Sequence, residues 1–246
     1  MPSNSEALAS FVESAPPGEL SNVTNAINTI AGDSSLQSLG PALEKYNEEQ
    51  FTTVTLPGSS QPGQVIVSSH NSLGEGRYFD VESQSSFAFD HTTQKASAVQ
   101  SYALESKNAD LIKSILKSLT THANEHYPSS SLGVYPVQND GAIAILLVAN
   151  KYSPNNFWNG RWRSHYTFSS GQLTGNIRVD VHYYEDGNIA SIERKYQEDL
   201  NKAFGSLSEG AFKGLRRQLP ITRQKIEWEK ISGYRLGQDI GGGRAR

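Results

Sequence analysis

The sequence predicts an α+β protein that begins with short helices and continues into antiparallel β-structure. Three observations support this fold class. Apolar residues recur near helical spacing within the first 50 residues, runs rich in Val, Ile, Thr and aromatic residues begin at Phe51, and hairpin-length loops join the runs between Gly133 and Tyr184. With 246 residues, the chain is long enough to bury a substantial core.

The N-terminal segment, residues 1–50, is predicted to form three short helices. They are expected at Ser5–Ser14, Glu19–Ile30 and about Ser35–Glu48, and the breakers Pro16-Pro17-Gly18 and Gly32-Asp33 separate them. Amphipathic helices of this length are marginally stable alone, so the three must pack against one another.

A small antiparallel sheet is predicted for residues 51–92. Turns that contain Gly, Pro or Ser separate its candidate strands, which are Phe51–Leu56, Gln64–Ser69, Arg77–Asp80 and Ser86–Asp90. Residues 95–127 return to a helical pattern that ends at Pro128. The pattern is clearest in the apolar residues Leu111, Ile112, Ile115, Leu116 and Leu119.

The richest β-pattern follows and predicts a central antiparallel meander. Its strands are expected at Gly133–Val137, Ala142–Lys151, Arg161–Phe168 and Asn176–Tyr184. In the last of these, apolar and polar residues alternate, as in a strand with one buried face. A helical pattern then runs from Ile189 to about Gln218. We expect residues 93–211 to form one region of helix, sheet and covering helix, with residues 212–246 as a separate C-terminal extension.

The composition is typical of a soluble globular protein from a reducing compartment. Apolar residues make up 36% of the chain, the net charge is −3, and there are no cysteines; the mean hydropathy is −0.51. No apolar run approaches the roughly 18 residues that a membrane helix needs, and residues 1–17 do not resemble a secretory signal. We therefore expect a cytosolic protein that is not transmembrane.

Motifs for catalysis, cofactors or metals are absent from the sequence. His122 and His126 stand at helical spacing, but Ala123 occupies the position where a zinc protease motif requires Glu. The Gly74-Glu75-Gly76 stretch lacks the remainder of a dinucleotide fingerprint. Glu185 and Asp186 precede Gly187 in a turn signal. We expect no catalytic residue, no cofactor, no metal and no enzymatic activity.

Positive charge is concentrated at the C-terminal end. Residues 212–246 hold nine basic groups against three acidic ones, a net of +6 that leaves −9 on residues 1–211. Such asymmetry suits an acidic partner, although a solvated terminus produces the same pattern. Nucleic acid is a poor candidate, because the whole chain is acidic and no RNA-binding fingerprint is present.

The same end of the chain is amphipathic. On a helix starting at Phe212, the apolar residues Phe212, Leu215 and Leu219 form one stripe, beside the basic residues Lys213, Arg216 and Arg217. Pro220 ends or kinks that helix. Farther on, Trp228 and Ile231 lie in a broad apolar arc that must dock either on the rest of the fold or on a partner.

Three blocks resemble a known protein family. Phe212–Arg223 reads FKGLRRQLPITR and is similar to the C-terminal signature FK(A/E)LRRxLPxxR of capping protein alpha subunits. Val181–Ile189, which reads VHYYEDGNI, resembles the other signature of that family, and Asn156–Ser164 is a third matching block. Weaker similarity covers nearly the whole chain, including Ala15–Glu19, Phe87–His91 and Glu125–Pro128.

The resemblance implies a non-enzymatic subunit of an obligate heterodimer with a homologous beta subunit. In that family the N-terminal helices form a stalk, long helices cover one continuous antiparallel sheet formed by both subunits, and the complex caps actin filament barbed ends without Ca²⁺. It implies Lys213, Arg217 and Arg223 as basic actin contacts, with Arg216 beside them. Trp228 and Ile231 would belong to the segment that docks on the heterodimer or on actin. It also implies inhibition by phosphoinositides and a place at cortical actin in the cytoplasm.

Two features of the sequence, one residue and one segment, depart from the family pattern. Gly214 replaces the usual Ala or Glu, which weakens the basic helix by about 1 kcal/mol. Only residues 189–211 separate the two signatures, where the family carries a longer stretch with one more strand and the first half of a long helix. Either the chain has lost a sheet strand or the sequence is a truncated gene model. This shortening motivates an alternative, a module that binds phosphoinositides or acidic proteins without capping.

Overall fold

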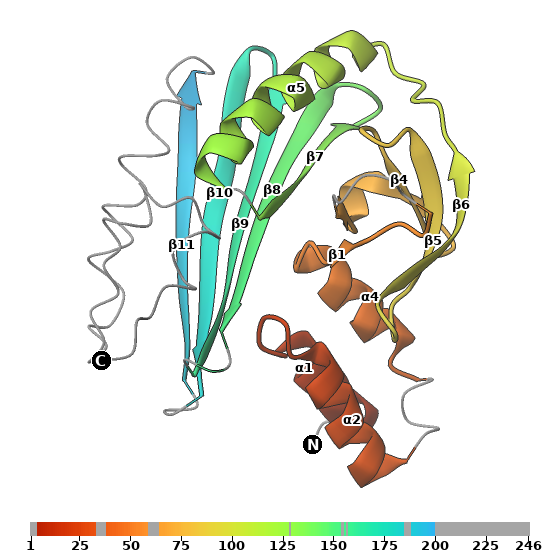
Figure 1. The fold of residues 1–246 in the computed structure, drawn as a ribbon, viewed down its shortest axis with the longest axis vertical. Helices are drawn as coiled ribbons and strands as arrows, with labels where there is room; N and C mark the ends of the chain where they lie inside the picture. Colours follow the sequence, from red (N-terminus) through yellow and green to blue (C-terminus); the bar gives the residue numbers. More distant parts are fainter. Residues whose placement is uncertain are drawn as a thin grey trace, which may run out of the picture. The chain divides into compact units, whose positions relative to one another are not determined.

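The computed structural model describes residues 4–32, 38–58, 64–127, 129–153, 155, 157–184 and 188–199. Within them the chain forms N-terminal helices, antiparallel sheets and one longer helix, which confirms the predicted α+β class (Figure 1). The chain divides into two compact units. The first comprises Met1–Glu105, Lys151–Arg161 and Val181–Ile189, and the second comprises Ser106–Asn150, Trp162–Asp180 and Ala190–Arg246.

Among the described residues, three helices open the first unit. They are α1 (Asn4–Glu13), α2 (Leu20–Ala31) and α4 (Gly40–Glu49). The first two confirm the predicted helices closely. α4 starts later than expected, with Pro41 in its first turn, where a missing N–H costs nothing; the predicted start at Ser35 lies outside the described residues.

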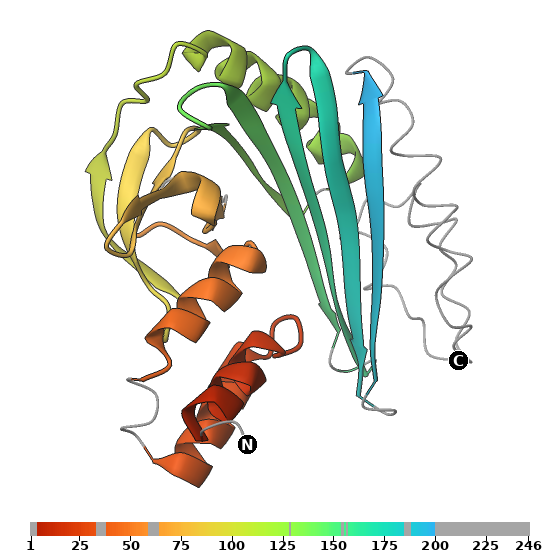
Figure 2. The ribbon, with the colours of Figure 1, turned by 180° about the vertical axis from the view of Figure 1, so that it is seen from behind.

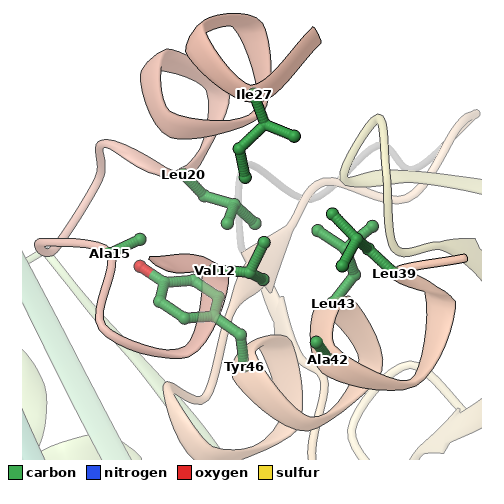
Figure 3. Packing of buried hydrophobic residues seen from close by; sticks show 8 residues of the cluster. All are labelled: Val12, Ala15, Leu20, Ile27, Leu39, Ala42, Leu43 and Tyr46. Carbon is green, nitrogen blue, oxygen red and sulfur yellow. The ribbon is translucent and has the colours of Figure 1, made fainter. Parts of the chain in front are cut away.

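The three helices share one apolar core (Figure 3). Val12 of α1, Leu20 of α2 and Leu43 of α4 are at most 2% exposed. Tyr46 closes the core and donates a hydrogen bond from its hydroxyl to the backbone oxygen of Pro16 at 3.2 Å. Burial of each large side chain contributes roughly 1.5–3 kcal/mol, which stabilises helices too short to persist alone.

A four-stranded antiparallel sheet follows in the first unit. Its order is β3 (Ser72–Gly74), β4 (Arg77–Asp80), β5 (Ser85–Asp90) and β6 (Lys95–Ser101). A short ladder of β1 (Thr53–Val54) and β2 (Val65–Ile66), with the 3-10 turn η1 (Ser69–Asn71), precedes it. Tyr78 and Phe87, both fully buried, lie at the centre of its core.

The predicted helix from residue 95 is wrong over β6. This segment pairs with β5 from Asp90 opposite Lys95 to Ser85 opposite Ser101. The Asp90 carboxylate accepts hydrogen bonds from the backbone N–H groups of Thr92 and Thr93 at 2.8 and 3.2 Å, which reverses the chain. β6 is a largely exposed strand, so pairing rather than its helix-favouring composition decides its structure.

In its described part, the second unit combines one helix with most of a five-stranded antiparallel sheet. α5 (Ala109–His126) precedes β7 (Ser130–Val137), β8 (Ala142–Ser153), β9 (Trp158–Ser169), β10 (Gln172–Tyr183) and β11 (Asn188–Asp199). The sheet order is β11-β10-β9-β8-β7, a meander as predicted. α5 crosses one face of the sheet in Figure 1, and Figure 2 views the other face. The buried side chains of α5 include Ile112, Leu116 and Leu119.

The turn between β7 and β8 also holds the start of α5. Ser106 donates its hydroxyl to the Asp140 carboxylate at 2.7 Å, and the side-chain amide of Asn108 donates to the Asp140 backbone oxygen at 2.9 Å. The carboxylate thus lies next to the first turn of a helix, where negative charge is favourable.

The predicted helix that begins at Ile189 is wrong as far as Asp199, because these residues belong to β11 (Asn188–Asp199). A lost strand, one of the two explanations for the short connection, is also wrong, because a further strand follows β10 among the described residues. An unpaired edge of β10 would expose a row of backbone donors and acceptors, and β11 pairs with them. The remainder of the predicted helix, residues 200–218, lies outside the described residues.

Candidate interaction surface

The predicted actin-binding residues lie outside the described part of the chain, which ends at residue 199. These residues are Lys213, Arg216, Arg217, Arg223, Trp228 and Ile231. The structure does place most of the other two signature blocks, at the ends of β9 and β10 that belong to the first unit. There they meet the loop between α1 and α2.

The side chain of Glu19 contacts both of these blocks. Glu19 stands directly before α2, yet its side chain makes no cap bond to that helix. Its carboxylate instead accepts a hydrogen bond from Nδ1 of His182 on β10 at 2.7 Å and one from Nδ2 of Asn159 on β9 at 3.3 Å. The side chains of Glu19 and His182 are only 12% and 13% exposed, so the contact is largely shielded from water.

Tyr184 completes the group around Glu19. Asn159 donates from Nδ2 to its hydroxyl oxygen at 2.6 Å, and the ring of His182 meets the Tyr184 ring edge-on at 5.0 Å between centroids. Burial, followed by the negative charge of Glu19, raises the pKa of Tyr184 above its ordinary value. We call Glu19, Asn159, His182 and Tyr184 the Glu19 joint.

Arg161 extends the polar contacts along β9. Its guanidinium donates to the Tyr152 hydroxyl at 2.7 Å and to both the backbone oxygen and the side-chain oxygen of Gln50 at 3.3 Å. Arg161 is 6% exposed, so these partners offset the cost of burying its charge. They also tie the residue after α4 to the sheet end.

Gly18 allows the α1–α2 loop to approach Tyr152. Its φ is +77°, in the left-handed region that glycine tolerates. A Cβ at this position would lie 2.7 Å from Cε1 of the Tyr152 ring. The Pro16-Pro17-Gly18 breaker therefore does more than separate two helices, because it brings Glu19 to the sheet.

The ends of β8 and β9 also present aromatic side chains to solvent. Tyr152 and Phe157 are 44% and 54% exposed. Lys151 places Nζ 5.7 Å from the centre of the Trp158 ring, within cation–π range. Burial lowers the pKa of Lys151.

A second polar junction connects α4 to the four-stranded sheet. The Tyr78 hydroxyl donates to the Glu48 carboxylate at 2.9 Å and lies 3.2 Å from Nε2 of His91. The amide nitrogen of Asn47 donates to the backbone oxygen of His91 at 3.0 Å, and its oxygen accepts from Thr52 at 2.9 Å. Burial lowers the pKa of His91 and raises that of Glu48.

In the second unit, Asp180 links three strands. Arg163 on β9 donates to its carboxylate at 2.6 Å and Arg178 at 2.9 Å, and the hydroxyl of Ser191 on β11 also donates to it. Burial alone would raise the pKa of Asp180, but these hydrogen bonds and positive charges outweigh it and lower the pKa. Arg163 and Asp180 are 8% and 3% exposed, so this is a buried ion pair.

These arrangements hold elements together and offer no catalytic geometry. Among the described residues, no group of three or more His, Cys, Asp or Glu side chains is placed to hold a metal ion. The described helices include none that is long and apolar enough to cross a membrane. The Glu185-Asp186 pair lies outside the described residues.

The sequence indicates the blocks but not the contacts that join them. It places Glu19 at a helix start and in a stretch that resembles the family, and it indicates no role for Gln50 or Tyr152. The available signal is that Ala15–Glu19, Asn156–Ser164 and Val181–Ile189 each resemble the family. Each of these stretches contributes at least one residue to the Glu19 joint.

Comparisons with known proteins agree with that resemblance. A family model described as F-actin capping protein alpha subunit matches residues 8–191 and 189–239. The chain is 61% identical to the F-actin-capping protein subunit alpha of Emericella nidulans and 57% identical to that of Neurospora crassa, over 100% of both chains in each case. The fold resembles that of the homodimeric actin capping protein alpha subunit from Plasmodium berghei, with a TM-score of 0.64 and 17% identity over 89% of this chain and 98% of the other.

The comparisons also locate a missing stretch. The alignment with the Emericella protein spans 275 positions against 246 residues of this chain, so at least 29 positions have no counterpart here. The family model breaks into two matches at residues 189–191. The short connection between the signatures noted in the sequence therefore coincides with the break.

Proposed function

This chain belongs to the F-actin capping protein alpha subunit family, and from that premise we propose that it caps filament barbed ends as one half of a heterodimer. Members of this family are actin-binding proteins and not enzymes. The observation that carries the proposal is the full-length identity of 61% to a capping protein alpha subunit. It is supported by a family match that continues to residue 239, across the whole basic segment.

The proposed actin contact is the basic segment Phe212–Arg223 with the apolar residues that follow it. Lys213, Arg217 and Arg223 supply positive charge, with Arg216 beside them, and such a cluster suits an acidic protein surface. Trp228 and Ile231 add apolar area, which a partner surface would remove from water. Binding at the filament end then blocks both addition and loss of actin subunits, without a requirement for Ca²⁺.

The proposed partner is a capping protein beta subunit. A strand of that subunit would continue the sheet, and helices α1, α2 and α4 would form a stalk from residues 1–50. Residues 51–92 would form the small β-region, 93–211 the covered central sheet, and 212–246 the actin-binding extension. We propose a place in the cytoplasm at cortical actin, where barbed ends are exposed.

Co-expression with the beta subunit of the same organism, followed by seeded pyrene-actin elongation, tests this function. A 1:1 complex should copurify, and nanomolar amounts should stop barbed-end growth in the presence of a Ca²⁺ chelator. Growth at the full rate, with a folded heterodimer present, would reject capping.

The alternative is a module that binds phosphoinositides or acidic proteins without capping, and the missing stretch at residues 189–191 is the observation that favours it. Sedimentation with vesicles that contain phosphatidylinositol bisphosphate separates the two. Under the main proposal, lipid binding and capping compete for the same basic residues. Lipid binding by a complex that leaves barbed ends free would favour the alternative.

A further inference from the structure

The five-stranded sheet ends in a strand that contains the break in the family match. The break lies at residues 189–191, and β11 covers Asn188–Asp199. β11 therefore starts with residues that precede the missing stretch and continues with residues that follow it. The relatives hold other residues at this point of the chain, since at least 29 aligned positions have no counterpart here.

The residues after the break do not favour a strand by composition. Ala, Glu, Arg, Lys and Gln are good helix formers, and they fill most positions from 190 to 199. Among these positions, Ile192 and Tyr196 are the β-favouring residues. Local preference thus conflicts with the observed strand, and contacts from elsewhere in the fold must decide the structure.

Those contacts come from β10. Its Asp180 is 3% exposed and receives the Ser191 hydroxyl in addition to the guanidinium groups of Arg163 and Arg178. A hydrogen bond to a buried carboxylate is stronger than one between neutral groups, because the acceptor carries a full charge. Without β11, β10 would also expose its backbone edge to water or to other chains.

We propose that residues 190–199 act as a replacement edge strand. They are held against β10 through the contact between Ser191 and Asp180, and they keep the sheet five-stranded although a stretch of the chain is missing. In the sequence, twelve residues, 200–211, then separate this strand from the basic segment. This inference does not depend on capping, because it concerns β10 and β11 alone.

The absence of cysteine makes a cross-link a direct test. In the full chain we would combine Asp180→Cys and Ser191→Cys with Arg163→Met, which removes the cation that would otherwise be buried without its partner. Facing residues of adjacent strands lie at the Cα separation that a disulfide requires. Mild oxidation should join the two cysteines within one chain, as detected by mass spectrometry of the linked peptides.

The matched control moves one cysteine to the other end of β10, as Gln172→Cys with Ser191→Cys and Arg163→Met. It should give no intrachain link. Failure of the 180–191 pair to cross-link in a variant that still melts cooperatively would overturn the proposal, as would equal cross-linking of both pairs.

A second pair of variants decides the matter if the cysteine variant does not fold. Glu193→Pro and Arg194→Pro change neighbouring residues, whose N–H groups point to opposite sides of a strand. In the free full chain, hydrogen exchange of residues 190–199 should accelerate about tenfold or more in one variant and stay within about twofold in the other. Equal acceleration in both, as expected for a helix, would contradict a replacement strand.

Discussion

The Glu19 carboxylate lies 2.7 Å from Nδ1 of His182, across 163 positions of the sequence. Glu19 ends the loop between α1 and α2, and His182 stands near the end of β10 within a signature block. Asn159, from another matching block, donates to the same carboxylate. In the described residues, these two blocks therefore join the N-terminal helices to the sheet end.

We expect Glu19→Ala to destabilise the first unit. Removal of the carboxylate takes away the acceptor of the His182 Nδ1–H group, which costs about 1–3 kcal/mol, while Asn159 keeps its hydrogen bond to the Tyr184 hydroxyl. Urea unfolding, followed by circular dichroism, measures the loss. Glu13→Ala is the matched control, because the Glu13–Lys45 pair is exposed to solvent and should change little on removal. Equal shifts of the two midpoints would show that the Glu19 joint adds no stability.

Gly18→Ala and Gly171→Ala separate backbone strain from steric conflict. Both glycines have nearly equal positive φ, +77° and +78°, so the two alanines share a backbone strain of about 1 kcal/mol. A Cβ at Gly18 meets the Tyr152 ring at 2.7 Å, whereas nothing lies within 4 Å of a Cβ at Gly171. In thermal unfolding, we expect the Gly18 variant to lose about 1–3 kcal/mol more of its free energy of unfolding than the Gly171 variant. A larger loss at Gly171 would contradict the close approach.

The sequence predicted local structure well where pattern and packing agree. Ile177 and Val181 alternate with Arg178 and Asp180 in β10, and the structure buries both apolar residues; it also buries Asp180, which pairs with Arg163 and which the alternation placed on the exposed face. Prediction failed in β6 and in β11, where helix-favouring residues pair along a neighbouring strand. Partners such as Glu19 and His182 could not be predicted either, because nothing in one sequence states which distant residues meet.

Acidification should weaken the junction between α4 and the four-stranded sheet. Burial lowers the pKa of His91, so the unfolded chain takes up a proton near pH 6.5 before the folded chain does. The unfolded state then binds more protons, and stability falls as the pH drops from 7 toward 5.5. The raised pKa of Glu48 acts in the opposite direction, but only once the pH approaches the range of carboxylates.

His91→Gln tests this assignment, since glutamine keeps a donor for the Tyr78 hydroxyl and does not titrate. We expect the free energy of unfolding to fall between pH 7 and 5.5 by up to about 1.4 kcal/mol per pH unit more in the wild type than in the variant. Urea titrations at several pH values provide the comparison. Parallel curves for the two proteins would exclude His91 as the titrating group.

The basic segment should be needed for capping and not for assembly. Lys213→Ala, Arg217→Ala and Arg223→Ala together remove three charges from the proposed actin contact, and each charge-assisted contact contributes about 1.5–3 kcal/mol. We expect at least about a hundredfold loss of barbed-end affinity with an unchanged elution volume of the heterodimer. The control Lys107→Ala, Lys113→Ala and Lys117→Ala removes as many charges from the first half of α5 and the residues before it. Wild-type capping by the first variant would remove these residues from the proposed contact.

Growth of single actin filaments, observed by fluorescence microscopy with both ends in view, tests the central claim most directly. The heterodimer of this chain with its beta subunit should halt elongation at barbed ends while pointed ends continue to grow. Continued growth at both ends, in the presence of a folded heterodimer, would contradict the account.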